Sequence, residues 1–338
     1  MTPQNSDTRS LMYLHTFGVA VKAKNIIPVF RQKNLTENKH LLEGNFLVLG
    51  QGSNVLFVND FAGNVFVNKL KGKTILAENE NEVLLKVASG ENWHRLVRFC
   101  VQKKWGGIEN LALIPGTAGA APVQNIGAYG TEVADVLEFV EAVDIASGEK
   151  IIWQKKDLGL GYRQSNFKTI WKNRYFITAI GIKLYKNAEI QPNYPMVRET
   201  MEKMFPQQKH DLTHVFEAVC AIRSAKLPDV KKWGNAGSFF KNPVISLADA
   251  HTLQANFPQM PHFSVENGVK IPAAWLIEQC GWKNKATDKV GVYPNQALII
   301  VNKGGATGAE IWDFAQQIIA SVQENFGVGL EPEVQIVF

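Results

Sequence analysis

The segment LIPGTAGAAPVQNIGAYG, residues 113–130, constrains the fold more than any other part of this sequence. It contains four glycines and two prolines. Glycine is unfavourable inside helices and strands, and proline lacks the backbone donor that both need. The segment therefore predicts a long loop. Loops of this length in compact domains usually serve a function, so a ligand is expected against it.

The elements expected around this loop indicate a mixed α+β protein. Strands are expected to dominate before about residue 190 and helices after about residue 210. Three strands of one sheet and a later strand are predicted at 136–145, 150–154, 175–184 and 296–302. Helices are predicted at 92–102, 211–228 and 307–327, the last opened by a capping box of Thr307 and Glu310.

Composition excludes several functional classes. Lys and Arg (36) exceed Asp and Glu (31) without forming a basic block, so nucleic-acid binding is not indicated. The cysteines Cys100, Cys220 and Cys280 are odd in number and far apart, so neither a disulfide framework nor a zinc site is expected. The histidines show no metal-binding spacing, and no apolar run is long enough to span a membrane. A soluble, cytoplasmic protein without a metal is predicted.

The stretch Gly50-Gln51-Gly52-Ser53-Asn54 is a second glycine-rich loop, flanked by β-forming residues. It begins like a dinucleotide-binding fingerprint, but Val55 takes the place of the third glycine and a strand follows instead of a helix. No Gly-Lys-Ser/Thr is present, which excludes a P-loop. Two such loops between strands suit a pyrophosphate held by backbone amides. Taken alone, the first loop is better explained as an ordinary turn.

Ser238 lies among small residues in GNAGSFFKNP, residues 234–243. A nucleophile elbow needs Gly-x-Ser-x-Gly, whereas Ser238 follows Gly237 directly and precedes Phe239. The hydroxyl is therefore not predicted to attack a substrate. Without further context, a serine in such a turn is more often structural than catalytic.

The whole chain from residue 15 resembles the UDP-N-acetylenolpyruvoylglucosamine reductase family, in its subgroup with a tyrosine loop, here around Tyr194. The resemblance is carried, in chain order, by GQGSNVLF, LIPGTAGAAPVQNIGAYG, GYRQSNFK, KLPD, GNAGSFFKNP, AAWLIEQCGWK, NQALIIVN and LEPEV. It implies a vanillyl-alcohol-oxidase-like (PCMH-type) FAD-binding domain in two lobes and a smaller α+β substrate-binding domain. The implied segments are the lobes 1–75 and 76–215, the substrate domain 216–328, and a C-terminal strand 329–338.

The resemblance implies a set of binding residues. Non-covalent FAD would contact Gly50, Gly52, Ser53, Asn54, Pro115, Gly116, Thr117, Gly119, Gln124, Asn125, Gly127 and Ala128. The substrate would contact Tyr194, Lys226, Asn242, Tyr129, Gln296 and Arg223.

Three residues would carry the chemistry that the resemblance implies. Hydride from flavin N5 would add to C3 of the enolpyruvyl group, and Ser238 would protonate C2. Arg163, which alone would read as a surface arginine, would bind the substrate carboxylate. Glu333 would present a proton to that carboxylate, and family register favours it over the neighbouring Glu331.

The implied reaction reduces UDP-N-acetylenolpyruvoylglucosamine to UDP-N-acetylmuramate with NADPH, in peptidoglycan precursor synthesis, by a monomer. Two alternatives stay open: a sugar or alcohol oxidase on the same flavin fold, and a non-catalytic UDP-sugar-binding flavoprotein. The chain departs from the family pattern at Gln335, at Tyr293 and in WKNKATDK, which leaves details of substrate contacts open.

Overall fold

The computed structural model describes residues 9–186, 188, 190 and 194–338, and the chain forms two compact units. Unit 1 comprises the described residues up to Ala23, Gly52–Phe61 and Lys226–Phe338, and unit 2 comprises Lys24–Gln51 and Ala62–Ala225. Compactness thus divides the chain differently from the four expected segments, because residues from its beginning group with its last third. Those segments are defined by function and stay a prediction.

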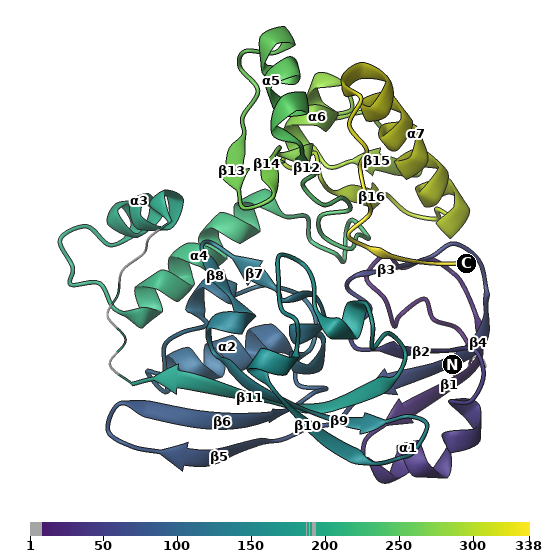
Figure 1. Cartoon of the computed structure of the whole chain (residues 1–338), viewed down its shortest axis with the longest axis vertical. Coiled ribbons are helices and arrows are strands. Elements are labelled where there is room, and N and C mark those ends of the chain that lie inside the picture. Colours follow the sequence, from purple (N-terminus) through teal and green to yellow (C-terminus); the bar gives the residue numbers. More distant parts are fainter. Residues whose placement is uncertain (1–8, 187, 189, 191–193) are drawn as a thin grey trace, which may run out of the picture. The chain divides into compact units, whose positions relative to one another are not determined.

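A five-stranded antiparallel sheet forms the base of unit 2. Its strands, in spatial order, are β10 (Lys150–Gln154), β9 (Leu137–Asp144), β11 (Tyr175–Tyr185), β6 (Glu82–Ala88) and β5 (Lys73–Glu78). The three strands expected to share a sheet do so (Figure 1). Strand β6 alternates, burying Val83, Leu85 and Val87, as a strand with one face on a core requires.

Two helices of unit 2, α2 (Trp93–Gln102) and α4 (Leu212–Lys226), contribute to the core that also holds the buried side chains of the sheet (Figure 1). Helix α2 begins where the side chain of Asn92 accepts a hydrogen bond from the N–H of Arg95. Helix α4 begins after Asp211, whose carboxylate accepts from two backbone N–H groups. Helix α3 (Pro195–Met204) adds two buried side chains to the same core.

Unit 2 also contains two smaller sheets. Strand β4 (Phe61–Asn68) lies between β1 (Ala23–Val29) and β2 (Phe46–Leu49), and it pairs with β2 in parallel. A second hydrophobic cluster joins Phe66 of β4 and Leu35 of helix α1 (Lys33–Glu37) to Phe176 of β11. The short strands β7 (Gly127–Ala128) and β8 (Thr131–Glu132) form a hairpin at the end of the glycine-rich loop.

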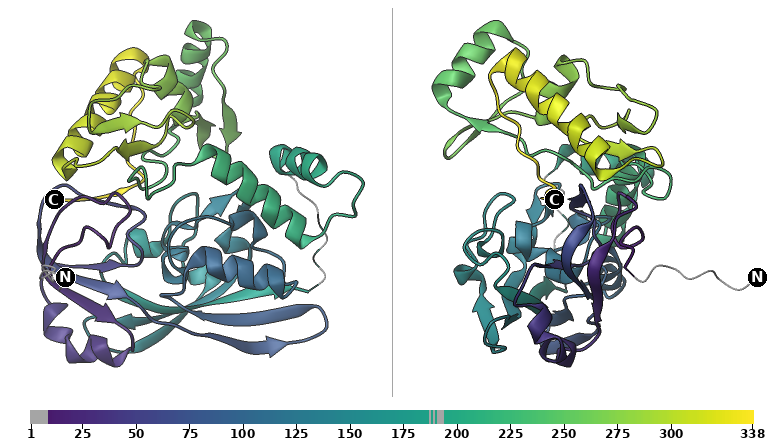
Figure 2. Two further views of the ribbon diagram at one scale, coloured as in Figure 1. Left: turned by 180° about the vertical axis from the view of Figure 1, so that it is seen from behind. Right: turned by 90° about the vertical axis from the view of Figure 1, so that its right-hand side faces the viewer.

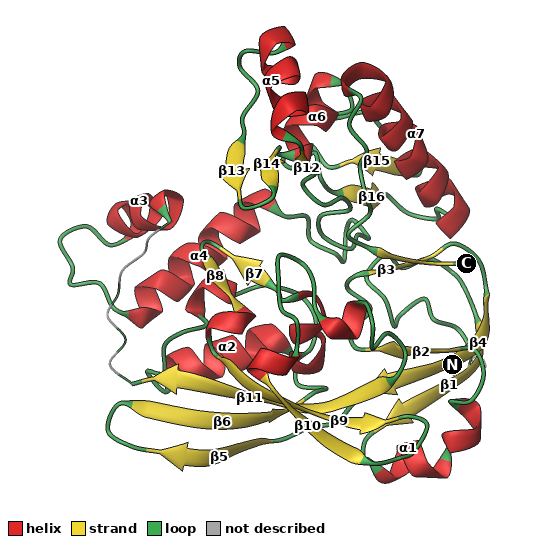
Figure 3. Cartoon of the chain, viewed as in Figure 1, coloured by secondary structure: helices red, strands yellow, loops and turns green. Residues whose placement is uncertain are grey.

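Unit 1 combines helices with small sheets. Strand β3 (Val55–Phe57) pairs in parallel with β17 (Gln335–Val337), and β15 (Val290–Val292) pairs with β16 (Ile300–Asn302). A third sheet has the order β12 (Val244–Ile245), β14 (Gly268–Lys270) and β13 (Phe263–Val265). The helices are α5 (Leu247–Asn256), α6 (Ala273–Gln279) and α7 (Gly308–Phe326), and α7 packs against α6, β15 and β16 (Figures 2 and 3).

Helix α7 confirms its predicted capping box, since Thr307 and Glu310 exchange both hydrogen bonds. The strand predicted over 296–302 is too long, because only Ile300–Asn302 is extended. The side chain of Gln296 accepts from the N–H of Leu298, and its carbonyl accepts from Ile299, which makes a turn. No helix in the described part of the chain is long and apolar enough to cross a membrane.

Candidate active site

The glycine-rich loop of unit 2 is fixed to the segment that leads into α2. The N–H of Trp93 donates to the carbonyl of Gly116 at 3.0 Å, and the N–H of Gly119 donates to the carbonyl of Ser89 at 2.8 Å. Pro115, at the start of this contact, is exposed. Because these bonds tie the loop to a buried helix, its backbone has a defined position before any ligand binds.

The two glycine-rich loops meet within unit 2. The side-chain oxygen of Gln51 accepts a hydrogen bond of 3.1 Å from the N–H of Gly116. A Cβ at Gly50 would lie 2.7 Å from Oγ1 of Thr117, so only glycine permits this approach. Thr117 is buried, yet its N–H and hydroxyl make no hydrogen bond among the described residues. These two polar groups are therefore available to a ligand, as expected of a cofactor site.

Asn125 joins the loop to the segment GYRQSNFK. It is buried, its amide donates to Glu132 at 2.7 Å and to the carbonyl of Gly161 at 3.2 Å, and its oxygen accepts from Ala134 at 3.0 Å. Both amide hydrogens thus have protein partners. The predicted flavin contacts of Asn125, and those of the half-buried Gln124 and Ala128, stay predictions.

Arg163 lies against the end of the same loop. Its guanidinium donates a 3.1 Å hydrogen bond to the carbonyl of Gly127. The Arg163 backbone is left-handed, with φ of 54°, an uncommon conformation for a residue with a side chain. A strained residue held by several contacts is typical of functional sites.

Three further predicted residues gather near Arg163 in unit 2. Arg223 donates to the carbonyl of Leu113 at 3.4 Å, and burial lowers its pKa, an effect that a hydrogen bond to Tyr129 opposes and the charge of Arg163 reinforces. Tyr129 meets the exposed ring of Tyr194 edge to face, with centroids 5.4 Å apart. Two guanidinium groups and two phenols form a positively charged cluster, suited to an anionic substrate. We call it the arginine–tyrosine cluster.

Gly52 and Ser53 belong to unit 1. There the close approach of the Leu14 backbone explains why position 52 is a glycine. The φ of Gly52 is 61°, and a Cβ would lie 2.3 Å from the carbonyl oxygen of Leu14. The N–H of Thr16 donates to the carbonyl of Gly52 at 3.0 Å. The N–H groups of Gly52 and Ser53 make no hydrogen bond within the described chain, so two consecutive donors remain for a phosphate.

Ser238 and Glu333 come together in unit 1 through a short antiparallel ladder. The N–H of Glu333 donates to the carbonyl of Phe239 at 2.8 Å, and Phe240 bridges Pro332. On the other side, the N–H of Phe239 donates to the carbonyl of Leu298 at 2.7 Å. Phe239 and Phe240 are almost completely buried, so they anchor the segment. Ser238 itself is half-buried.

The ladder also separates Glu333 from Glu331. Glu331 is opposite Lys241, forms a 2.7 Å ion pair with it and leaves 77% of its side chain exposed. Glu333 is half-buried and opposite Phe239. The backbone carbonyl of Glu333 also accepts a 3.2 Å hydrogen bond from the side-chain amide of Asn54. Asn54 therefore helps to hold the C-terminal segment, and its predicted flavin contact stays a prediction. The geometry fits the preference for Glu333.

Other predicted substrate residues of unit 1 have structural partners. The side-chain oxygen of Asn242 accepts from the N–H of Ala273, the first residue of α6, at 2.9 Å. Gln296 forms the turn that contains Leu298, and the carbonyl of Leu298 accepts a hydrogen bond from the N–H of Phe239. Lys226 is the exposed last residue of α4. The ring of Tyr293 lies 6.4 Å from that of Trp233.

Sequence reasoning missed the residues that support GNAGSFFKNP. The N–H of Asn235 donates to the carbonyl of Thr16, and that of Gly234 donates to Asn302. Asn302 in turn donates from its amide to the carbonyl of Phe17 at 2.9 Å. The small residues of this motif thus pack against residues 15–18. The signal was present, because HTFG opens the resemblance.

The described residues include no group of histidine, cysteine or carboxylate side chains that could hold a metal ion. The predicted catalytic residues are distributed over both units, Arg163 in unit 2 and Ser238 and Glu333 in unit 1.

Two family models match the chain. Residues 229–337 match the model described as "UDP-N-acetylenolpyruvoylglucosamine reductase, C-terminal domain", and residues 40–152 match "FAD binding domain". These matches confirm the expected fold, a mixed α+β chain with an FAD-binding domain and a separate C-terminal domain.

Similar proteins cover nearly the full chain. The reductase of that name from Amoebophilus asiaticus is 46% identical over 331 residues, 97% of each chain. The one from Escherichia coli O6:H1 is 41% identical over 333 residues, 97% of this chain and 95% of its own. A crystal structure of UDP-N-acetylenolpyruvylglucosamine reductase (MurB) from Thermus caldophilus superposes with a TM-score of 0.66 at 22% identity, covering 97% of both chains, which supports the fold.

Proposed function

Because the chain belongs to the UDP-N-acetylenolpyruvoylglucosamine reductase family, we propose that it reduces UDP-N-acetylenolpyruvoylglucosamine to UDP-N-acetylmuramate with NADPH, in peptidoglycan precursor synthesis. The observation that carries this proposal is the ladder of unit 1, which holds Ser238 next to the strand of Glu333. A proton donor and a carboxylic acid on adjacent strands suit a reaction that needs a proton beside a carboxylate.

The residues present fit an FAD. The N–H groups of Gly52 and Ser53 and the N–H and hydroxyl of Thr117 would hold its polar parts without a covalent link. When bound, FAD would supply the hydride chemistry: reduced by NADPH, its N5 would give a hydride to C3 of the enolpyruvyl group.

Arg163 binds the substrate carboxylate in this proposal. Its planar guanidinium can make two parallel hydrogen bonds to a carboxylate, and its bond to the carbonyl of Gly127 fixes the orientation of the plane. The rest of the arginine–tyrosine cluster, together with Lys226, Asn242 and Gln296, supplies donors for the sugar and the diphosphate.

Ser238 delivers the proton to C2. Once C3 has gained the hydride, C2 carries negative charge that is shared with the carboxylate, and such a carbon is basic enough to take a proton from a hydroxyl held against it. Glu333, in its protonated form, donates to the same carboxylate and stabilises that charge. The buried rings of Phe239 and Phe240 keep the Ser238 backbone in one position while this happens.

The test is anaerobic spectroscopy of the purified FAD-loaded protein. NADPH should bleach the flavin absorbance, and UDP-N-acetylenolpyruvoylglucosamine should restore it with formation of UDP-N-acetylmuramate. A sugar or alcohol oxidase would be bleached by a sugar or alcohol and restored rapidly by oxygen. A non-catalytic binding protein would shift its spectrum with the UDP-sugar but not turn it over. Either result would refute the proposal.

The proposal extends to the setting of the reaction. We propose a monomer in the cytoplasm that acts on small molecules without nucleic acid or membrane, and membership of the subgroup with a tyrosine loop. The contact of Tyr194 with Tyr129 supports the subgroup, because it brings the loop residue to the glycine-rich segment. Pro192 and Asn193, which precede Tyr194 in the expected turn, lie outside the described residues.

A further inference from the structure

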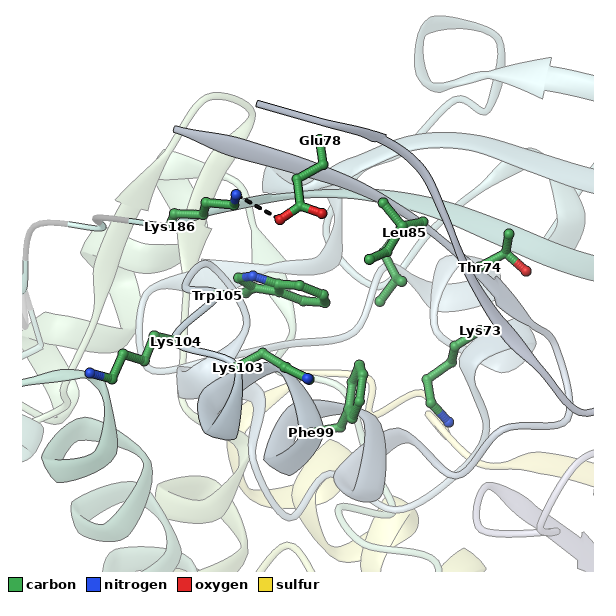
Figure 4. A pocket seen from close by; sticks show the side chains of 10 residues that line it. Lys73, Thr74, Glu78, Leu85, Phe99, Lys103, Lys104, Trp105 and Lys186 are labelled. Atoms are coloured by element: carbon green, nitrogen blue, oxygen red, sulfur yellow. Dashed lines mark ion pairs between the residues drawn. The ribbon is translucent and has the colours of Figure 1, made fainter. Parts of the chain in front are cut away.

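Unit 2 contains a pocket that the proposed reaction does not use. It is an open cavity of about 900 Å³ between strands β5 and β6 and the C-terminal half of α2 (Figure 4). The glycine-rich loop contacts α2 at its first residue, Trp93, whereas the pocket begins near its end, at Phe99 and Lys103. We call this cavity the lysine pocket.

The inner part of the lysine pocket is apolar and aromatic. Leu85 and Trp105 are packed in the core of unit 2, 1% and 7% exposed, whereas Phe99 is only partly buried and its ring meets that of Trp105 edge to face with centroids 5.9 Å apart. Figure 4 shows Leu85, Trp105 and Phe99 around the centre of the cavity. The exposed part of the Phe99 ring can pair with a flat ring, because aromatic pairs gain from edge and face contacts beyond the area they bury.

The rim carries an excess of positive charge, since four lysines and one glutamate line the pocket. Lys186 pairs with Glu78 at 2.6 Å, and Lys73 pairs with Glu91 at 3.6 Å while its ammonium lies 5.4 Å from the Phe99 ring centre. Lys103 and Lys104 are exposed, and neither has a carboxylate partner in the described part of the chain. Two cationic groups therefore remain to bind an anion.

We propose that the lysine pocket binds a flat, apolar organic anion, such as an aryl sulfonate or aryl carboxylate, with its ring against the partly exposed Phe99, over the packed Trp105 and Leu85, and its acid group at Lys103 and Lys104. Inorganic phosphate alone would leave the aromatic part of the pocket unfilled. An acidic peptide would instead pair along the free edge of β5, the outermost strand of the sheet, and that contact does not use the aromatic side chains.

The test is calorimetric titration of the FAD-loaded protein with naphthalene-2-sulfonate as the probe. We expect saturable one-to-one binding, weakened by added salt. The neutral analogue naphthalene-2-methanol should bind about tenfold more weakly, since it lacks the charge that the lysines bind. Absence of saturable binding at roughly 5 mM probe would overturn the proposal, because even millimolar affinity would then be excluded.

Two double variants locate the site. Lys103→Gln with Lys104→Gln should weaken binding of the probe about tenfold. Lys155→Gln with Lys156→Gln, a pair of adjacent exposed lysines after β10, should leave it unchanged. Phe99→Leu should also weaken binding while NADPH oxidation with the UDP-sugar continues at the wild-type rate. Probe binding that survives the Lys103/Lys104 change would come from another site, the substrate site included, and would refute the assignment.

Discussion

The backbone N–H of Glu333 donates a 2.8 Å hydrogen bond to the carbonyl of Phe239, the residue after Ser238. Together with the bond from the N–H of Lys241 to the carbonyl of Glu331, it joins the last segment of the chain to the motif GNAGSFFKNP. It places the two residues that the proposed mechanism uses as acids on neighbouring strands of one unit.

Ser238→Ala should slow reoxidation of reduced flavin by the UDP-sugar about 10²–10⁴-fold, because a positioned acid is lost. Reduction by NADPH should keep its rate, since that step needs no proton from Ser238. Anaerobic stopped-flow of the two half-reactions measures both. Ser238→Cys should recover part of the rate. Equal slowing of both half-reactions in the alanine variant would mean a distorted site and would remove the acid role.

Glu333→Gln and Glu331→Gln form a matched pair in LEPEV. Glu333→Gln should slow the reoxidation half-reaction, because the amide cannot give its proton to the substrate carboxylate. Glu331→Gln removes an exposed ion pair with Lys241, worth about 0–1 kcal/mol, and should leave both rates unchanged. If Glu331→Gln is the slower variant, the assignment from the ladder is wrong.

Arg163→Lys should lower turnover of the UDP-sugar about 10²–10³-fold, the usual effect of removing a donor to a developing charge. Lysine keeps the charge but has no planar pair of donors. Flavin reduction by NADPH is the internal control and should survive. An unchanged rate of reoxidation would show that Arg163 does not bind the carboxylate.

Gly52→Ala should destabilise the protein by more than about 2 kcal/mol. The new Cβ would lie 2.3 Å from the carbonyl oxygen of Leu14, and φ of 61° is strained for alanine. Gly44→Ala, where a Cβ would meet nothing within 4 Å, is the control. Chemical denaturation of both variants measures the difference. FAD loss in Gly52→Ala without loss of stability would show that the cofactor, and not Leu14, requires this glycine.

Stability should fall as pH drops below about 6.5, partly through His94. Its ring accepts from the N–H of Leu113 at 3.1 Å and stacks on Phe216. Burial, and next the charges of Arg98 and Arg223, lower the pKa of His94. Between that lowered pKa and 6.5, the unfolded chain binds more protons than the folded one, so acid favours unfolding.

His94→Asn keeps an acceptor that does not titrate in this range, so its melting temperature should decline less between pH 7 and pH 5. His251→Asn, at an exposed position of α5, should follow the wild type. Burial also lowers the pKa of His15. Both variants should therefore keep part of the dependence of melting temperature on pH. Identical slopes in His94→Asn and wild type would contradict this role.

Features that depend on residues close together in the chain could be predicted from the sequence. The capping box of Thr307 and Glu310 and the buried stripe of α7 follow from spacings of three and four residues, and these interactions form within the helix. Three of the five strands of the large sheet, β9, β10 and β11, were equally predictable, because alternation and β-forming residues are local properties. The motifs of the candidate site could be recognised from the types of their residues and from their order along the chain.

What those motifs contact could not be predicted from the sequence, because it depends on the packing of distant segments. Gly52 is required by the approach of Leu14, and the strand predicted over 296–302 is shortened by a turn whose residue Leu298 binds Phe239. The ladder between Phe239 and Glu333, and the grouping of the first described residues with the last third of the chain, join segments far apart in sequence. Such contacts depend on how whole elements pack, because closing a long loop costs entropy that only the assembled core repays, and no local pattern records that balance.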